Sequence, residues 1–586
     1  MIQGTLVSLS VMLLSGCGSN KLEDSKTNTS TTSTATLVKK NHMTTLGTEE
    51  VIKPTVINTE LTKPTVIVIP EVIKPIIITI PKVVEPTIMV TTEIVKPIVI
   101  PNLIDQHFII TVKTDNNTTS LANTFTIPTY PYANYNYNID CDNDGVDEAS
   151  AQNQNYTCEY ENPGTYTIVI KDNTNKKEGF PRIYFNNSGD KHKLIGINQW
   201  GTGKWTSMHT AFQGCDNLSN AQGEATDTPN LSKVKDMSFM FYGASSFNQD
   251  IGDWNTSNIR NMRSTFNGAS SFNQDIGSWN TSKVKNMSSL FNHAHVFNQD
   301  ISSWNTSKVR TMSHMFFKAS AFNQNINTWD VSRVRNMSYM FFNASLFNQT
   351  LNAWDTKELK YMRGMFFNAS AFNQDINTWD TSKIKNMNFL FYGASSFNQD
   401  LSAWNTDNVK TMRYMFFIAS AFNQDISTWN TSKVKSMAYM FFSASAFNQD
   451  ISTWETRATK DMRWMFYGAS AFNQDTGTWD TSKVKNMRGM FFSAISFNQD
   501  ISTWHTSKVK TMGYMFFNAS VFNQDLSTWN TSKVRNMNYM FHNALSLENQ
   551  DLSSWDVKKV SRRGNFMHGT GANNTEPIWR TAYNTH

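Results

Sequence analysis

A 25-residue unit recurs without a gap from about Met237 to Trp529, and this strict period constrains the fold more than any other feature of the chain. The unit that starts at Met237 reads Met-x-x-Met-Phe-x-x-Ala-x-x-Phe-Asn-Gln-Asp-Ile-x-x-Trp-Asn-Thr, and the later units differ from it at only a few positions. A unit this short cannot bury its own apolar residues, so neighbouring units must bury them together as stacked turns. The sequence therefore predicts a repeat solenoid, although a length of 586 residues would also accommodate several globular domains.

Core positions within a unit are spaced by two, three or four residues, as in the run Ile251, Trp254, Thr256, Ile259, Met262 and Phe266. This rhythm is typical of leucine-rich repeats. It predicts a short β-strand near each Trp-Asn-Thr segment and a tight turn near Met-Phe-x-x-Ala. We place the solenoid at 186–570, because the pattern degenerates at both ends as a stacked array requires. Residues 571–586 are expected to form a C-terminal tail.

The first 17 residues contain an apolar run from Leu6 to Leu14 that is too short to span a bilayer, which is typical of a signal peptide. The run ends in Leu14-Ser15-Gly16-Cys17, which resembles the lipobox of bacterial lipoproteins. The resemblance implies that residues 1–17 direct export and that Cys17 carries a lipid anchor to the membrane. Gly18 and Ser19 follow Cys17 in place of an acidic pair, which by the same resemblance favours the outer membrane or cell surface. The alternative is an ordinary cleaved signal peptide.

Two low-complexity segments follow this predicted leader. Residues 18–50 are mostly Ser, Thr, Asn and Lys and cannot bury a core, so we expect a disordered tether. Residues 51–103 carry Lys-Pro or Glu-Pro every ten or eleven positions, between Thr, Ile and Val residues. Proline at this spacing excludes helix and β-branched residues favour an extended backbone, so a stiff, extended stalk is predicted.

Residues 104–185 contain short alternating runs of apolar and polar residues between turn residues, which predicts a small all-β sandwich. Cys141 and Cys158 lie in this exported segment with a short loop between them, so we expect a disulfide. Cys215 falls where later units carry alanine, and we expect a buried free thiol there.

The string Pro163-Gly164-Thr165-Tyr166-Thr167-Ile168 resembles the last strand of PKD-like modules, which are immunoglobulin-like domains of bacterial surface proteins. The Trp-Gly-Asp-Gly turn of those modules is replaced here by an acidic loop. In that loop Asp140, Asp142, Asp144 and Asp147 have the alternate spacing of calcium loops, whose oxygen ligands suit Ca²⁺. The bidentate glutamate of an EF-hand is missing, so a calcium site and a plain solvated turn both fit the sequence.

One column of the repeat is basic in all thirteen units, and its first members are Lys235, Arg260, Lys285, Arg310 and Arg335. Like charges at the ~5 Å spacing of stacked turns repel one another unless something offsets them. The column that contains Asp250 is acidic in eleven of thirteen units and is one such offset. The alternative is a basic stripe that binds sulfated or sialylated glycans or an acidic protein.

A second column varies between units and is aromatic in eight of thirteen, including Tyr339, Tyr414, Tyr439, Trp464, Tyr514 and Tyr539. Freedom to vary in a rigid unit indicates an outward position, so this column is a candidate contact strip for protein or sugar rings. The alternative is an aromatic stack that seals the flank of the solenoid. By contrast, the Asn-Gln pair that begins at Asn248 recurs in every unit, and we expect its amides to form an inward ladder that satisfies backbone groups.

The string Met-Phe-x-x-Ala-Ser-Ala-Phe-Asn-Gln-Asp-Ile-Ser-Thr-Trp-Asn-Thr-Ser-Lys-Val-Lys at 415–435 closely resembles the BspA-like repeat of bacterial surface lipoproteins, which is also abundant in mycoplasmas. The resemblance covers residues 186–570. It implies a leucine-rich-repeat protein that is exposed on the cell surface and is often adhesive.

No cluster of nucleophile, base and orienting residue interrupts the repeat, and a non-catalytic protein without a cofactor is expected, calcium aside. The net charge of +5, from 52 basic and 47 acidic residues, is too small to predict a nucleic-acid partner. We therefore expect an adhesin-like protein that binds a host matrix protein or a glycan. A passive surface spacer and, less favoured, a polysaccharide-processing enzyme are the alternatives.

Overall fold

The computed structural model describes residues 106–118 and 120–579, all of which belong to one compact unit, Val95–His586. The predictions for Cys17, for the tether at 18–50 and for the stalk at 51–103 lie outside the described residues. Within the described ranges the chain forms strands, turns and bridges but no α-helix. Accordingly, that part of the chain offers no helix with the length and apolar character needed to cross a membrane.

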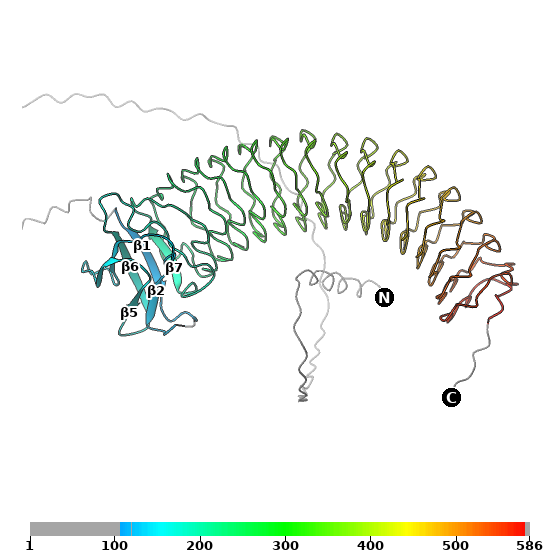
Figure 1. Ribbon diagram of the computed structural model, residues 1–586, viewed down its shortest axis with the longest axis horizontal. Coiled ribbons are helices and arrows are strands. Elements are labelled where there is room, and N and C mark those ends of the chain that lie inside the picture. Colours follow the sequence, from blue (N-terminus) through cyan, green and yellow to red (C-terminus); the bar gives the residue numbers. More distant parts are fainter. Residues whose placement is uncertain (1–105, 119, 580–586) are drawn as a thin grey trace, which may run out of the picture. The chain divides into compact units, whose positions relative to one another are not determined.

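Seven strands form the N-terminal part of this unit (Figure 1). Five of them make one antiparallel sheet in the order β4-β3-β6-β1-β7, and the other two, β2 and β5, pair as a second sheet. The strands are β1 (Phe108–Lys113), β2 (Thr124–Ile127), β3 (Tyr137–Asp140), β4 (Ala149–Gln152), β5 (Tyr156–Glu159), β6 (Thr165–Asp172) and β7 (Leu194–Gln199).

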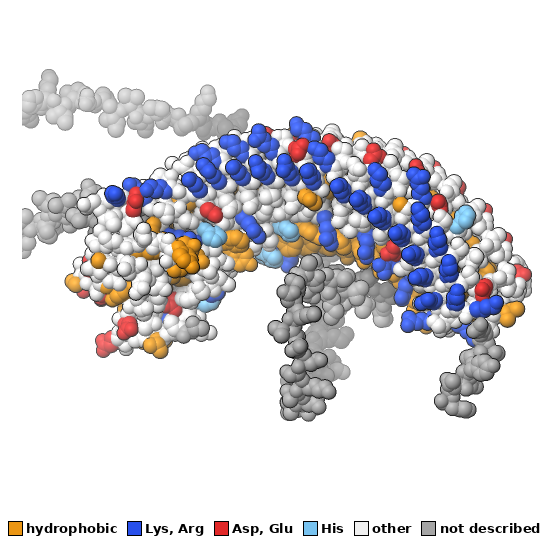
Figure 2. All heavy atoms as spheres, viewed as in Figure 1, with side chains coloured by type: hydrophobic (Ala, Val, Ile, Leu, Met, Phe, Trp, Pro, Cys, Tyr) orange, Lys and Arg blue, Asp and Glu red, His pale blue; other side chains and the backbone are white. Residues whose placement is uncertain are grey.

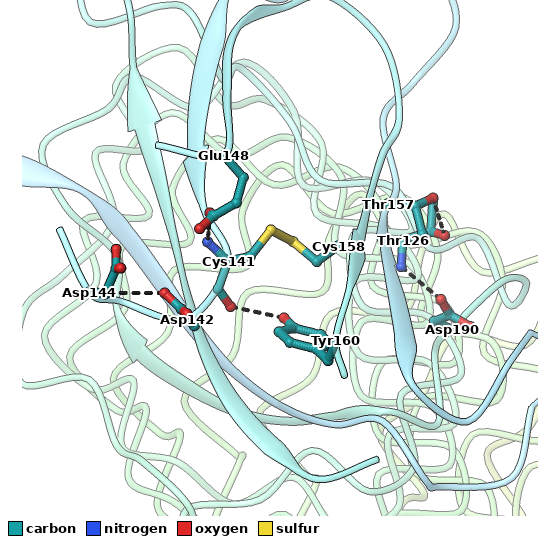
Figure 3. The surroundings of a disulfide bond; sticks show 9 residues. All are labelled: Thr126, Cys141, Asp142, Asp144, Glu148, Thr157, Cys158, Tyr160 and Asp190. Carbon is teal, nitrogen blue, oxygen red and sulfur yellow. Dashed lines mark hydrogen bonds between the residues drawn. A yellow bond between two sulfur atoms is a disulfide. The ribbon is translucent and has the colours of Figure 1, made fainter. Parts of the chain in front are cut away.

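A disulfide joins Cys141, directly after β3, to Cys158 on β5, so it links the two sheets (Figure 3). The hydroxyl of Tyr160 donates a hydrogen bond to the carbonyl oxygen of Cys141 at 2.9 Å and supports the same corner. Apolar side chains such as Ile110, Phe125 and Ile168 fill the space between the sheets and are fully buried. A seven-stranded domain of this size thus combines a small core with a covalent link.

The sheet extends beyond the boundary that the sequence predicts at residue 185. Strand β7 pairs with the far side of β1, and it also forms a parallel bridge from Ile197 to Glu224 at the start of the repeats. Trp200 and Trp205 continue the core, because Trp205 packs edge-on against Phe108 at 5.0 Å and Trp200 packs against Trp254 at 5.1 Å. The domain therefore covers the N-terminal end of the repeat array and shares one core with it.

From Trp205 onward the chain forms stacked turns (Figure 1), which we call the repeat array, and these turns are 25 residues long between Met237 and Trp529. Backbone hydrogen bonds join each turn to the next: the amides of Met262, Ser264 and Phe266 donate to carbonyl oxygens 24 residues later at 2.9–3.0 Å. Large apolar side chains stack in the same register, with Phe266 and Phe291 rings 5.7 Å apart. The buried indole N–H of Trp279 donates to the carbonyl oxygen of Ile251 at 2.9 Å.

The prediction of a strand near each Trp-Asn-Thr segment is wrong for the described turns of the array. The described turns of the array contain only single-residue parallel bridges, and most of these lie just before the first methionine of the unit, as between Asp236 and Asn261. Two residues per turn, in the columns that include Ser264 and Gly268, have positive φ in every turn. These left-handed residues interrupt extended backbone in the segment that follows the bridge, so the bridge does not lengthen into a strand there.

The C-terminal segment also differs from the prediction of a tail at 571–586. Residues up to 579 pack on the last turn: the amide of Leu552 donates to Thr575 at 2.9 Å, and the amide of Thr575 donates to Gln550 at 2.7 Å. Trp579 packs edge-on against the buried Phe566 at 5.1 Å. These contacts cover the end of a core that would otherwise be exposed to water.

Candidate binding surface of the repeat array

The basic column of the repeat forms an exposed line of cations. All thirteen side chains are exposed, and the backbone beneath them is fixed because the amide of Arg260 donates to Lys235 at 2.8 Å and that of Lys285 to Arg260 at 2.9 Å. This spacing holds neighbouring charges at the distance of stacked turns, ~5 Å. The members of the basic column are Lys235, Arg260, Lys285, Arg310, Arg335, Lys360, Lys385, Lys410, Lys435, Lys460, Lys485, Lys510 and Arg535.

The acidic column does not pair with this line. Among residues 106–118 and 120–579, the only ion pair of the basic column joins Arg335 to Glu358 at 4.0 Å, and no salt bridge reaches the column of Asp250. Asp250 instead accepts a hydrogen bond from the amide of Gly252 at 2.9 Å, two residues ahead. The described aspartates of this column thus form no ion pairs with the basic column and cap their own turns instead.

A second row of cations lies two residues before the basic column and was not singled out from the sequence. Figure 2 shows Lys and Arg side chains in regular rows over the face of the array turned to the viewer, with few acidic side chains among them. The signal was the Lys-x-Lys or Lys-x-Arg string of most units. The exposed members of this second row are Lys233, Lys283, Lys308, Arg333, Lys383, Lys433, Lys483, Lys508 and Lys533.

The variable aromatic column is half-buried, and neighbouring rings stack on one another. Tyr414 and Tyr439 are 4.4 Å apart and Tyr514 and Tyr539 are 5.1 Å apart between ring centroids. Each of these residues also has a left-handed backbone, near φ 60°. Burial is the main cause that raises the pKa of Tyr439 above its ordinary value. The rings thus form the stack of the second alternative, and they stay partly exposed, so the contact strip remains a prediction.

Two glycines interrupt this column, and an arginine fills the space beside each. The guanidinium of Arg363 lies 5.7 Å from the ring of Tyr339 and 5.2 Å from that of Phe389. Arg488 likewise lies 5.6 Å from Trp464 and 5.1 Å from Tyr514. These are cation–π distances, so both arginines extend the stacked surface and add positive charge to it.

A further stack of rings follows the first phenylalanine of each unit and was missed in the sequence, although the Phe-Phe pairs signal it. It runs unbroken from Phe317 to His568 with centroid distances of 4.0–5.0 Å, and nearly all its rings are partly exposed. Its members are Phe317, Phe342, Phe367, Tyr392, Phe417, Phe442, Tyr467, Phe492, Phe517, His542 and His568.

The Asn-Gln column forms the amide ladder that the sequence predicts. The side-chain oxygen of Asn248 accepts the amide of Asn273 at 2.8 Å, and the side chain of Gln274 donates to the carbonyl oxygen of Asn248 at 2.9 Å. This pattern repeats along the array. The Asn-x-Ser strings have a local role too, because the side-chain oxygen of Asn255 accepts the amide of Ser257 at 3.2 Å.

The acidic loop of the N-terminal domain brings three of its four aspartates together. Oxygen atoms of Asp140, Asp142 and Asp144 lie within 4.8 Å of one another, whereas Asp147 pairs with Lys171 at 2.7 Å. The Lys171 ammonium also lies 3.1 Å from the buried Asp140, which leaves one Asp140 oxygen without a partner. The three carboxylates suit a hard cation, but Lys171 already supplies positive charge to this loop.

Cys215 is the remaining described cysteine outside the disulfide, and it is fully buried. Burial raises the pKa of its thiol well above the ordinary value, so it stays protonated and unreactive at neutral pH. Its side chain belongs to the core of the first turns and not to the candidate binding surface.

Stacked turns, a shared core and rows of exposed cations, few of them in ion pairs, define a repeat protein with a positively charged face. A family model described as "Mycoplasma protein of unknown function, DUF285" matches the chain five times, at residues 183–294, 206–328, 296–402, 373–479 and 460–579. The chain belongs to this family. Comparisons with curated proteins and with solved structures found no match.

Proposed function

We propose that this chain is a non-catalytic, lipid-anchored surface protein whose repeat array binds anionic polymers of a host or of the environment, with sulfated glycans of a matrix as the favoured class. In this proposal the array is a BspA-like solenoid of the leucine-rich-repeat type, and the seven-stranded domain is a PKD-like module that covers its end. The observation that carries the proposal is the basic column, in which thirteen exposed cations form one line and only Arg335 has an acidic partner among the described residues.

The physical argument concerns the cost of holding like charges in a line. Twelve steps of ~5 Å place the thirteen cations along a path on the order of 60 Å. Their repulsion is relieved when a polyanion lies along the line, and binding releases the counterions of that polyanion. Affinity should therefore fall steeply as salt concentration rises, which a contact made only through aromatic rings would not show.

A surface location is supported by independent features of the chain. The apolar run before Cys17 and the lipobox resemblance favour export and an anchor, and the disulfide between Cys141 and Cys158 is of the kind that persists in oxidising compartments. In this proposal residues 18–103 hold the array away from the membrane. The identical settings of the repeated aspartates favour a non-catalytic role, since acid and base need carboxylates in different environments.

The test is saturable binding of the purified full-length chain to heparin, to unsulfated dextran and to double-stranded DNA, each at several salt concentrations. We expect saturation with heparin that weakens as salt rises, and no saturation with dextran. Equal affinity for DNA at equal charge density would replace the glycan with a nucleic-acid partner. An absence of binding to any of the three would favour the passive spacer.

A further inference from the structure

One turn of the array departs from the repeat on its basic face. The position directly after the basic column carries small or acidic polar side chains in the described turns between Asp236 and Asn536, except at Tyr361. The Tyr361 side chain is 59% exposed, so the core does not explain it. Large exposed aromatic side chains are uncommon away from contact surfaces, which makes this position a candidate for binding.

The hydrogen bonds between turns open beside Tyr361. In every other described turn from Arg260 to Arg535, the amide of the basic-column residue donates to the basic-column residue one turn earlier. The amide of Lys385 makes no such bond to Lys360. The amide of Met362 makes none to Asn386, although the equivalent methionines from Met262 to Met537 donate at this position. Two adjacent rungs are therefore missing at one junction.

A hollow of about 600 Å³ lies at this junction. Tyr361 lines it together with four cations and one acid, which are Lys360, Arg363, Lys383, Lys385 and Glu358. The acid is already neutralised, because Glu358 pairs with Lys383 at 2.7 Å, and that hydrogen bond is the main cause that lowers the pKa of Glu358.

The remaining cations of the hollow are available. Lys360 and Lys385 are exposed and take part in none of the salt bridges among residues 106–118 and 120–579. Arg363 is held in place by the rings of Tyr339 and Phe389. The hollow is thus lined by an exposed aromatic residue and two lysines without ion pairs, at a junction where two backbone N–H groups donate to no carbonyl of the neighbouring turn.

We propose that this hollow is the anchoring subsite of the array and takes one sulfated sugar ring of the polymer. The Tyr361 ring would pack against the apolar face of the sugar, and Lys360 and Lys385 would bind its sulfate groups. The inference rests on the proposed function, and it adds a single preferred site to an otherwise uniform line of charge. A polyphosphate chain matches the charge but lacks the ring, so it serves as the discriminating probe.

The experiment measures the affinity of the full-length chain for a heparin hexasaccharide by titration calorimetry. Tyr361→Asn introduces the residue that this position carries at Asn336 and Asn386, so the fold is retained. We expect it to lower affinity about five- to tenfold, as the loss of one ring contact does, and we expect Tyr361→Phe to keep most of the affinity.

The charge of the hollow is tested with two matched pairs. One double variant, Lys360→Gln with Lys385→Gln, removes two basic-column charges at the open junction. The control double variant, Lys435→Gln with Lys460→Gln, removes two basic-column charges at a junction where the amide of Lys460 still donates to Lys435 at 3.0 Å. We expect the fold-loss in hexasaccharide affinity of the Lys360/Lys385 double variant to be at least three times that of the control double variant. Thermal unfolding of each variant checks the fold.

Two results would overturn the subsite and leave the proposed function standing. In the first, both lysine double variants lose the same affinity for heparin and Tyr361→Asn has no effect. In the second, Tyr361→Asn lowers the affinity for polyphosphate as much as the affinity for heparin. The first would show that the line of charge binds uniformly, and the second that the hollow selects phosphate and not a sugar ring. If the unaltered chain binds no hexasaccharide at any salt concentration, both proposals fail together.

Discussion

Single residues in the aromatic column show that space, and not backbone conformation alone, selects glycine in this array. Gly489 has a φ of +58°, but Trp464, Tyr514 and other large residues of the same column have equally positive φ values. A Cβ atom at Gly489 would lie 2.0 Å from Cε3 of Trp464. Glycine is thus required because the neighbouring indole leans over it, which lets Trp464 approach Tyr514 to 6.2 Å across the gap.

This argument predicts the effect of Gly489→Ala. We expect the free energy of unfolding to fall by about 1–3 kcal/mol, because the added methyl group overlaps the indole of Trp464. The double variant Trp464→Ser with Gly489→Ala should recover part of that loss, since serine fills the same column at Ser264 and Ser289. The measurement is chemical unfolding of the unaltered protein, of the single variants Gly489→Ala and Trp464→Ser, and of the double variant. Additive losses in the double variant would contradict the steric explanation.

The contacts of Lys171 with the acidic loop lead to a second prediction at the scale of single residues. Burial favours a lower pKa for Lys171, but hydrogen bonds to Asp147 and Asp140 outweigh it and raise the pKa above its ordinary value. Lys171→Met would leave Asp140, which is 1% exposed, without its counter-charge. We expect a loss of about 1–3 kcal/mol, measured by thermal unfolding, because a buried carboxylate then lacks its partner.

Calcium provides the control for that prediction. Because Lys171 already pairs with Asp140 and Asp147, we expect millimolar calcium to leave the Tm of the unaltered protein within about one degree. A rise of several degrees that chelation reverses would instead identify the loop from Asp140 to Asp144 as a calcium site.

The sequence predicted those residue roles that the period itself enforces. The amide ladder from Asn248 follows from repetition, since polar groups stacked at ~5 Å must satisfy one another. The left-handed residues could not be predicted in this way, because Tyr414 and Ile418 have no intrinsic preference for positive φ. Tyr361 gave a signal, as the only aromatic residue in its polar column, but its meaning depends on the open junction beside it.

At the scale of the single turn, the aspartates act as caps. Asp300, Asp425 and Asp500 each accept a hydrogen bond from the amide of the serine two residues later at 2.8 Å. This backbone hydrogen bond is the main cause that lowers the pKa of each of the three carboxylates. At the equivalent position Asn325 accepts the amide of Asn327 at 2.9 Å, so a neutral oxygen can also cap the turn.

These caps predict how stability depends on pH. A carboxylate whose pKa is lower in the folded state stabilises the fold above its unfolded pKa, 3.8 for aspartate, and that stabilisation is lost as pH falls through the folded value. We expect the Tm to be nearly constant above about pH 5 and to fall below pH 4. Replacing Asp300, Asp425 and Asp500 by Asn should make that fall shallower. An identical profile for the triple variant would show that these caps do not control acid unfolding.

The elements of a turn were only partly predictable. The tight turn near Met-Phe-x-x-Ala is present, because small and bulky residues alternate there around a buried core. The strand near Trp-Asn-Thr is absent from the described turns, since the threonine hydroxyl of Thr256 binds the carbonyl oxygen of Asn280 at 3.2 Å and Asn255 forms a local turn. Side chains thus replace the backbone ladder that a leucine-rich repeat pattern suggests.

At the scale of the whole unit, stability is shared between neighbouring turns. The apolar core is one continuous cluster from Phe108 to Met567, and every turn contacts only the turns before and after it through the backbone bonds described above. Such arrays behave as a sum of repeat and interface terms, with covered ends. The seven-stranded domain and the segment up to Trp579 supply those covered ends.

This view predicts that a complete turn can be removed. Deletion of residues 429–453 joins Thr428 to Trp454 and keeps the 25-residue register, so we expect a folded protein whose denaturant m-value falls by the share of one turn. Deletion of residues 429–440 joins Thr428 to Phe441 instead, which shifts every apolar position against its neighbour, and we expect that protein to lose cooperative unfolding. The complete deletion also removes Lys433 and Lys435, so its heparin affinity should depend less steeply on salt. If the two deletion variants unfold with the same cooperativity, the turns are not independent stacking units. If the salt dependence of heparin affinity is unchanged in the complete deletion, the basic column is not the contact that binds the polyanion.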